Sequence, residues 1–243
     1  MGRCLYDAAV NPTPTKLTTT KLTTAKPPLS KLRRRLRRTL PDARLDINSL
    51  PGCRGLKLAL INADYPQGPL HPDVMRAVIH QPAYWSFCWG SGLALAQHLL
   101  AGKEEVRDKT VLDLGSGSGV AGIAAAMAGA QRVIACDIDP DACLATAVNA
   151  ELNGVAIDVI QSLDQLHRPV DLVLLADVLY DRANFGLIDL AKNAGTRVLI
   201  ADSRIRELSR DDFTPFAERE ARTLPNLGEF DEFRVVRFFE SRQ

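Results

Sequence analysis

Residues 111–122 constrain the fold of this chain more than any other segment. They read VLDLGSGSGVAG, an apolar strand followed by a glycine-rich turn and a helix of small residues. Glycine at 115, 117 and 119 lets the backbone turn tightly and leaves room for a ligand against the main chain. The helix that follows directs its first N–H groups into the same space. The turn therefore predicts a nucleotide-like cofactor, with Gly115, Gly117 and Gly119 among its contacts.

Strand and helix patterns alternate from residue 110 onward. Strands are expected at 110–114, 132–137, 156–161, 170–176 and 196–201, and helices at 119–129, 140–153 and 181–193. Nearly uninterrupted apolar strands are typical of a parallel sheet that is covered on both faces. Two further strands, at 216–224 and 232–240, are expected to pair around a turn at 225–228. The pattern predicts a Rossmann-like α/β fold: a doubly wound, mostly parallel seven-stranded sheet with an antiparallel C-terminal strand pair.

The first 40 residues differ from the rest of the chain in charge. They carry ten basic residues and one acidic residue, a net charge of +9, whereas the remaining 203 residues carry a net charge of −8. Residues 1–28 are rich in Thr, Lys and Pro and are expected to form a disordered basic leader. We expect an N-terminal helical extension at 29–105 and the α/β domain at 106–243.

A short basic helix is expected at 31–40, with Ser30 as its N-cap. Leu32, Leu36 and Leu40 follow helical spacing, and arginines cover the other face. Three interpretations stay open: a docked helix with a solvated basic face, a contact for an acidic partner or nucleic acid, and part of an organellar transit peptide. The expected location is cytoplasmic, or the mitochondrial matrix if the leader is a transit peptide.

Composition argues against several other classes of protein. No apolar run approaches the roughly 18 residues of a membrane helix, so no membrane partner is expected. Five cysteines without a Cys-x-x-Cys pair favour reduced thiols over a disulfide framework or a zinc site, and no metal is expected. Residues 93–100, interrupted by Gln97 and His98, are expected to form a half-buried helix. His98 is interpreted as a core or boundary residue whose nitrogens are satisfied.

The choice of cofactor depends on what flanks the glycine turn. The spacing Gly117-x-Gly119-x-x-Gly122 also matches a dinucleotide fingerprint, so a dehydrogenase is considered. Asp113 can orient the turn or accept from the ammonium of S-adenosylmethionine, whereas it would repel a pyrophosphate. Dehydrogenases usually need a second domain for their substrate, and only about 40 residues follow the fifth strand. S-adenosylmethionine is therefore the expected cofactor, and Gly122 is interpreted as a site of close helix packing.

An acidic residue ends the second strand of the α/β domain. Asp137 lies 18 residues after Gly119, where a carboxylate accepts from the ribose hydroxyls of an adenosine ligand. Asp139 is interpreted instead as the N-cap of the next helix. Other cofactor contacts are expected in the turn, beside Asp137 and after the third strand, at Ser116, Ile138, Ser162 and Leu163.

The motifs VLDLGSGSG and ACDIDP resemble those of class I, seven-β-strand, S-adenosylmethionine-dependent methyltransferases. The patterns YWxxxWxxG at 84–92 and DVLY at 177–180 are similar to the protein-lysine methyltransferase group that includes the electron-transfer flavoprotein β-subunit lysine methyltransferase. Methyltransferases of ribosomal proteins are a more distant relation. The resemblance covers about residues 80–240. It implies that Trp89 borders the cofactor and that Asp177 and Tyr180 shape the acceptor site.

Methylation of a lysine requires its neutral amine, although the pKa of that amine in water is about 10.4. An apolar aromatic pocket lowers the pKa by desolvation, and a nearby carboxylate can hold the amine in line. We expect an enzyme that methylates lysine side chains of a protein, with Asp177 and Tyr180 as catalytic residues. One alternative is methylation of a small-molecule amine or heteroaromatic nitrogen. Another, from a different class, is a catalytically silent nucleic-acid binding protein that contacts its partner through the basic leader.

Overall fold

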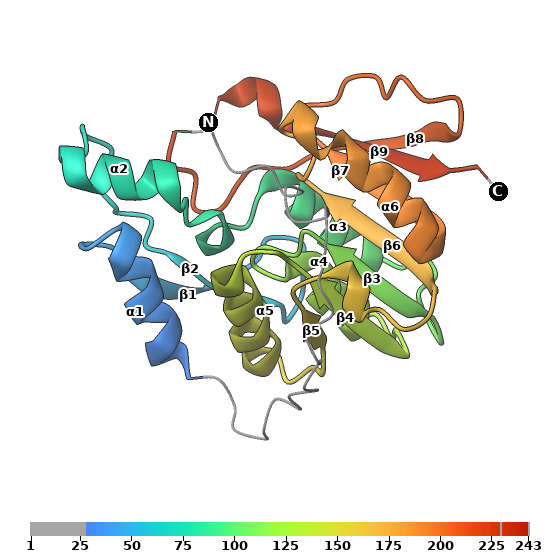
Figure 1. The fold of residues 1–243 in the computed structure, drawn as a ribbon, viewed down its shortest axis with the longest axis horizontal. Coiled ribbons are helices and arrows are strands. Elements are labelled where there is room, and N and C mark those ends of the chain that lie inside the picture. Colours follow the sequence, from blue (N-terminus) through green and yellow to red (C-terminus); the bar gives the residue numbers. More distant parts are fainter. Residues whose placement is uncertain (1–27, 229, 243) are drawn as a thin grey trace, which may run out of the picture.

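A seven-stranded sheet forms the centre of the structure, a computed structural model that describes residues 28–228 and 230–242 (Figure 1). In chain order its strands are β3 (Thr110–Leu114), β4 (Arg132–Cys136), β5 (Asp158–Ile160), β6 (Val170–Ala176), β7 (Gly195–Asp202), β8 (Phe213–Glu220) and β9 (Val235–Ser241). Their spatial order is β5-β4-β3-β6-β7-β9-β8. The strands from β5 to β7 are parallel, whereas β9 runs antiparallel to both of its neighbours. The predicted doubly wound sheet with an antiparallel C-terminal pair is confirmed.

Alternate side chains of the central strands enter two separate cores. In β6, Leu172 and Leu174 join the core beneath α3 (Gly90–Leu100) and α4 (Val120–Met127). Val173 and Leu175 join the core on the other face, beneath α6 (Gly186–Ala194). Burial of both faces requires apolar residues at successive positions, which explains the nearly uninterrupted apolar strands.

Within the described part of the chain, no helix combines the length and apolar character needed to cross a membrane.

The helix α3 differs from the half-buried helix predicted at 93–100. Nine of its eleven residues are buried, because α3 packs against α4 on one side and against β7 and β9 on another. His98 lies against the rings of Phe216 and Phe238, with centroid distances of 5.8 and 5.1 Å. Neither ring nitrogen of His98 has a hydrogen-bond partner among the described residues, so the prediction of a satisfied histidine is wrong. Burial lowers the pKa of His98.

The C-terminal strand pair is shifted from its predicted position. The strands β8 and β9 pair from Phe213 with Ser241 to Glu220 with Val235, so the connection is residues 221–234. The tight turn predicted at 225–228 is wrong because the connection pairs with a distant segment instead. Leu224 and Cys88 exchange two backbone hydrogen bonds of 2.8 Å. This pairing places residues 221–234 beside the beginning of α3.

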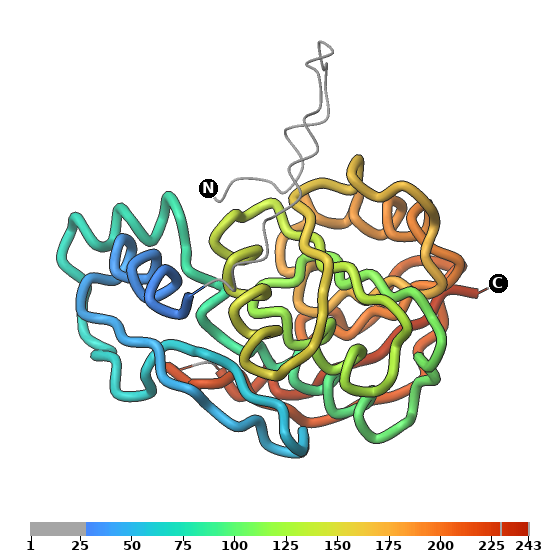
Figure 2. The backbone as a smooth tube through the Cα atoms, turned by 90° about the horizontal axis from the view of Figure 1, so that it is seen from below, coloured from blue at the N-terminus to red at the C-terminus, as the bar shows by residue number. Residues whose placement is uncertain are grey.

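An N-terminal extension packs along one side of the sheet domain, as the blue to teal segments show (Figure 2). Its elements are α1 (Leu29–Thr39), β1 (Leu45–Ser49), β2 (Lys57–Ile61), α2 (Pro72–His80) and the 3₁₀ helix η1 (Tyr84–Ser86). The strands β1 and β2 form a separate antiparallel pair. The predicted leader at 1–28 lies outside the described residues apart from Pro28.

The basic helix α1 is docked against α5 (Pro140–Leu152) through its leucine face. Leu32 and Leu36 are fully buried, and Arg35 forms an ion pair of 3.3 Å with Asp141 of α5. The helix begins at Leu29, and no side chain caps it, so the prediction of Ser30 as N-cap is wrong. Leu29 packs against the same apolar cluster, and the helix begins two residues earlier than predicted.

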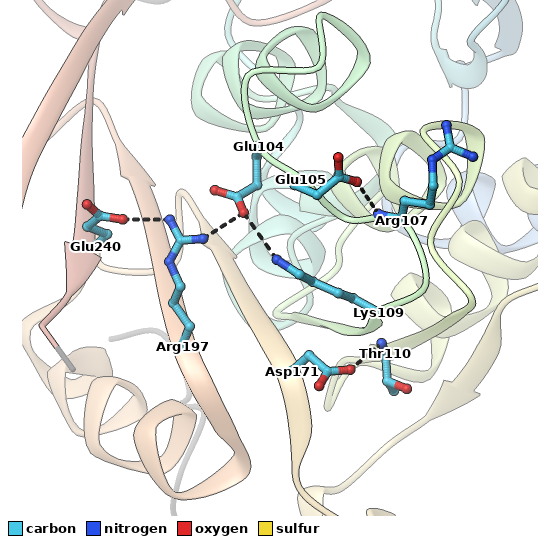
Figure 3. Close-up of polar contacts among 8 residues, drawn as sticks. All are labelled: Glu104, Glu105, Arg107, Lys109, Thr110, Asp171, Arg197 and Glu240. Atoms are coloured by element: carbon cyan, nitrogen blue, oxygen red, sulfur yellow. Dashed lines mark hydrogen bonds and ion pairs between the residues drawn. The ribbon is translucent and has the colours of Figure 1, made fainter.

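An ion-pair cluster joins β7, β9 and the connection before β3 (Figure 3). The buried Glu104 carboxylate accepts from Arg197 at 2.7 Å and lies 3.9 Å from the Lys109 ammonium. Arg197 also donates to Glu240 at 2.5 Å. Arg197 is near the beginning of β7, so the cluster lies at the amino ends of the parallel strands. It fixes the antiparallel β9 against the parallel part of the sheet.

The substitution His98→Leu is expected to stabilise the fold by about 1–3 kcal/mol, because it removes buried nitrogens that lack partners. The pKa of His98 is lowered in the folded state, so the unfolded chain binds this proton more readily. Wild-type stability therefore falls as the pH drops below about 6.5, the pKa of an unfolded histidine. Urea unfolding at pH 8 and pH 5 measures the effect, with exposed His167→Leu as the control. A stability difference between His98→Leu and wild type that does not grow from pH 8 to pH 5 would contradict this account.

Candidate active site

A cavity of about 330 Å³ opens at the carboxyl ends of β3, β4 and β6. Its walls come from the glycine turn, the first turn of α5, the segment η1 and the connections after β6 and β7. The lining residues are Tyr84, Trp85, Trp89, Gly115, Gly117, Asp137, Asp139, Ala142, Ala176, Asp177, Val178, Tyr180 and Arg204. In open α/β sheets, ligands bind at this edge, at the point where the strand order reverses. In this sheet that point lies between β3 and β6.

The glycine turn forms one wall of the cavity with its backbone. Gly115, Gly117 and Gly119 have φ angles of 77°, 53° and 82°, which favour glycine. A Cβ atom on Gly115 would lie 2.4 Å from Val178 Cγ1, whereas one on Gly117 would meet nothing within 4 Å. Open space therefore lies against the backbone of Gly117, at the beginning of α4. This cradle fits a cofactor that rests on the main chain.

Asp113 lies beneath the turn and is 2% exposed. Its Oδ2 atom accepts a 2.8 Å hydrogen bond from Gly122 N, and a Cβ atom on Gly122 would lie 3.0 Å from that oxygen. The interpretation of Gly122 as a site of close packing is thus confirmed. Of the two roles predicted for Asp113, these contacts match the one in which it orients the turn. Burial raises its pKa to about 7.

Asp137 holds the turn from the other side and lines the cavity. Its Oδ2 atom accepts from Gly117 N at 2.9 Å, and its Oδ1 atom accepts from Asp139 N at 3.0 Å. Burial raises the pKa of Asp137 to about 6. Asp139 accepts from Asp141 N at 2.8 Å, which confirms it as the N-cap of α5. Asp137 lines the cavity with a carboxylate, an acceptor that suits the ribose hydroxyls of S-adenosylmethionine, and its contact with the cofactor stays a prediction.

Six predicted cofactor contacts are not among the residues that line this cavity: Asp113, Ser116, Gly119, Ile138, Ser162 and Leu163. The Ser116 hydroxyl is buried 3.1 Å from that of Thr146, a residue that the sequence analysis missed. Ile138 is 48% exposed. Ser162 accepts from Asp164 N at 3.2 Å, and Leu163 packs against the core on the α6 face of the sheet. Their contact with a cofactor stays a prediction.

Aromatic side chains form the wall opposite the turn. Tyr84 and Trp85 belong to η1, and Trp89 immediately precedes α3. The Tyr84 ring lies 5.8 Å from the rings of both Trp89 and Tyr180, in edge-to-face arrangements. The Trp89 indole N–H donates to Tyr84 O at 3.0 Å. Trp89 and Tyr180 thus lie in one cluster with Tyr84, whose place at the cavity the sequence analysis missed.

Asp177 follows β6 and has a φ angle of 52°, which is strained for a residue other than glycine. Its carboxylate accepts from Ser91 N at 2.8 Å and from Ser91 Oγ at 2.6 Å, so it caps the first turn of α3. The Ser203 hydroxyl lies 3.3 Å from Oδ1. Burial, together with nearby Asp202, raises the pKa of Asp177 to about 6.

Arg204 is a cavity residue that the sequence analysis missed. It follows the end of β7, so the rule that loops after parallel strands meet at one edge could have found it. Its backbone N–H donates to the buried Asp202 carboxylate at 2.8 Å, and its guanidinium lies 4.2 Å from the centre of the Phe233 ring.

Within residues 28–228 and 230–242, no cluster of three His, Cys, Asp or Glu residues is arranged to hold a metal ion.

Comparisons with known proteins match the centre of the chain. The family model of ribosomal protein L11 methyltransferase (PrmA) matches residues 94–198. The human electron transfer flavoprotein beta subunit lysine methyltransferase is 46% identical over 107 residues, 42% of this chain and 40% of that protein. The ribosomal protein L11 methyltransferase of Acinetobacter baumannii (strain AYE) is 48% identical over 83 residues, 32% of this chain and 28% of that protein. The chain thus spans about half, or less, of the length of the curated relatives it matches.

Among solved structures, magnesium protoporphyrin IX methyltransferase (ChlM) from Synechocystis PCC 6803, with bound SAM, is 19% identical with a TM-score of 0.48. The alignment covers 74% of this chain and 88% of that one. The strand order and the glycine turn match the predicted fold, and the sequence matches support the predicted resemblance to class I, S-adenosylmethionine-dependent methyltransferases. The curated relatives that this chain is similar to are named as lysine and ribosomal protein methyltransferases.

The substitution Asp137→Asn is expected to weaken binding of S-adenosylmethionine by about tenfold or more, because a carboxylate makes stronger hydrogen bonds to hydroxyls than an amide does. The pKa of Asp137 is raised to about 6, so wild-type affinity should fall as the pH drops below 6 and this carboxylate becomes protonated. The variant should lose that pH dependence. Calorimetric titration from pH 5 to pH 8 measures both effects, with the exposed Asp158→Asn as the control. Wild-type affinity in Asp137→Asn at pH 8 would contradict the assignment.

Proposed function

We propose that this chain transfers the methyl group of S-adenosylmethionine to the Nζ atom of a lysine side chain on a protein. The observation that carries the proposal is a single cavity with two different halves. Gly117 and Asp137 line it after β3 and β4, the half that we assign to the cofactor, and Asp177 and Tyr180 line it after β6, the half that we assign to the acceptor. The human relative is named for a lysine of the electron transfer flavoprotein beta subunit, which supports a lysine acceptor.

The second half of the cavity suits the alkyl chain of a lysine. S-adenosylmethionine, when bound, supplies an electrophilic methyl group on a sulfonium ion. Tyr84, Trp89 and Tyr180 offer aromatic faces that would enclose the methylene groups and exclude water. An apolar environment disfavours the ammonium form, so it lowers the pKa of the lysine and frees the nitrogen lone pair. Alignment of that lone pair is the main contribution that such a displacement requires of the chain.

Asp177 is the group that we assign to orienting the amine. Each carboxylate oxygen can accept from two donors, so the bonds from Ser91 leave acceptor capacity toward the cavity. A pKa of about 6 leaves most of this carboxylate ionised at neutral pH. It can therefore accept an N–H of the amine before transfer and stabilise the positive charge on nitrogen afterwards. The cap on α3 keeps the carboxylate in place while it does so.

Labelling of a cell lysate tests the proposed reaction. The full chain is incubated with lysate and S-adenosylmethionine that carries a labelled methyl group, and parallel samples are digested with protease or nuclease. We expect label in a defined protein band, sensitive to protease, with methyl-lysine detected by mass spectrometry. Label only in small molecules, or label sensitive to nuclease, would contradict the proposal.

The substitution Asp177→Asn is expected to lower kcat by about 10- to 100-fold, because the amine loses its anionic partner and its alignment. Cofactor affinity should stay close to that of wild type, since Asp177 lines the other half of the cavity. Because the pKa of Asp177 is raised to about 6, wild-type kcat should also fall as the pH drops below 6, and the variant should lack this inflection. Steady-state kinetics and calorimetry separate the two effects. Loss of cofactor binding together with a lower melting temperature would instead assign Asp177 a role in folding through its cap on α3.

A further inference from the structure

Arg204 is a cation at the cavity that neither the cofactor half nor the proposed transfer step uses. It is exposed, and it lines the cavity with Asp177 and Tyr180. Its backbone is fixed because Asp202, 1% exposed at the end of β7, accepts from its N–H. The guanidinium lies 4.2 Å from the centre of the Phe233 ring, so the ring supports one face of the cation. The Arg204 side chain is thus held at the cavity, and its guanidinium N–H groups donate no hydrogen bond to the described residues.

The charge of Arg204 is not neutralised by an ion pair within the described part of the chain. The carboxylates that face it are Asp177 and Asp202, and the proximity of Arg204 lowers the pKa of both. The Asp177 oxygens are bonded to Ser91, and Asp202 Oδ1 accepts from backbone N–H groups. No described carboxylate lies within the 4 Å of an ion pair with this guanidinium.

The segment that carries Phe233 supplies two acidic residues, Asp231 and Glu232, and neither forms an ion pair with Arg204. Asp231 forms an ion pair of 3.0 Å with Arg222 and lies 3.8 Å from Arg234. The Arg204 guanidinium therefore keeps its charge and its donors available to an anionic group of a ligand.

We propose that Arg204 binds a carboxylate of the protein substrate, supplied by an Asp or Glu close to the target lysine. The proposal rests on the proposed lysine methylation and adds a specificity rule to it. The planar guanidinium can form two parallel hydrogen bonds with a carboxylate while its face remains on Phe233. This contact places the acidic side chain at the rim and the lysine in the aromatic half of the cavity. Arg204 thus selects lysines in an acidic setting over lysines flanked by neutral or basic residues.

A second role for Arg204, binding of the cofactor carboxylate, fits the sheet order less well. The cofactor half is built on β3 and β4, whereas Arg204 follows β7, which is separated from β3 by β6. Asp177, which we assign to the acceptor half, lies close enough to Arg204 for the guanidinium to act on its pKa. The two roles predict different measurements, because one changes the affinity for cofactor and the other changes KM for the protein substrate.

The test uses the protein that the full chain labels in a lysate, purified after mass spectrometry has located its methyl-lysine. Each Asp or Glu near that lysine is replaced by Asn or Gln. We expect Arg204→Gln to raise KM for the unaltered substrate by about 10- to 100-fold, the usual range for a hydrogen-bonded charge pair, and Arg204→Glu to raise it further. Replacing the acidic residue should raise KM for wild type to a similar extent. With the altered substrate, wild type and Arg204→Gln should have nearly equal KM.

Controls separate this proposal from the others. Arg168→Gln makes the same charge change at an exposed site before β6, at the opposite edge of the sheet, and should leave KM unchanged. Calorimetry should give Arg204→Gln the cofactor affinity of wild type, and a loss of that affinity would overturn the proposal in favour of cofactor binding. Equal KM for wild type and Arg204→Gln, or a labelled lysine without an acidic neighbour, would overturn it while lysine methylation stands. No labelled protein with wild type would remove the proposed function, and this inference with it.

Discussion

Two carboxylates, one buried and one half-buried, hold the glycine turn between them, and the rest of the cavity is built on that turn. Asp113 accepts from Gly122 N below the turn, and Asp137 accepts from Gly117 N beside it. The Asp113 bond fixes a backbone N–H that would otherwise lack a partner at the beginning of α4, and the Asp137 bond fixes one within the turn. The burial that raises the pKa of both carboxyls also excludes water from these bonds. The turn thus has one position relative to β3 and β4, and its open side faces the cavity.

The acceptor half depends on contacts between segments that are far apart in the chain. Asp177 caps α3 through Ser91, 86 residues earlier, and this bond joins the end of β6 to the helix that follows the aromatic segment. Leu224 pairs with Cys88 and so brings the connection before β9 to the same place. Tyr84 and Trp89 of the aromatic wall therefore belong to the segment before the sheet domain, while Tyr180, the carboxylate and the arginine belong to the sheet domain. Changes in the docking of the extension would alter the acceptor half more than the cofactor half.

The parts of the molecule that local sequence determines could be predicted. Residues close together in the chain determine the glycine turn, the role of Gly122 and the cap at Asp139. The periodicity of apolar residues was enough to place the parallel strands along the chain. The surroundings of His98 could not be predicted, because its two aromatic neighbours come from strands more than 100 residues away. The connection 221–234 was missed for the same reason, since its pairing partner is Cys88. Arg204 lacks a motif, and only the position of β7 places it at the cavity.

A crystal structure of the full chain with S-adenosylhomocysteine tests the central claim most directly, because it locates the cofactor product relative to both halves of the cavity. The account predicts that the ribose hydroxyls bond to the Asp137 carboxylate and that the adenosine lies against the backbone of Gly117. It also predicts that the sulfur atom faces the space between Trp89, Asp177 and Tyr180. A ligand whose ribose lies away from Asp137, or whose sulfur faces away from Asp177, would contradict the account.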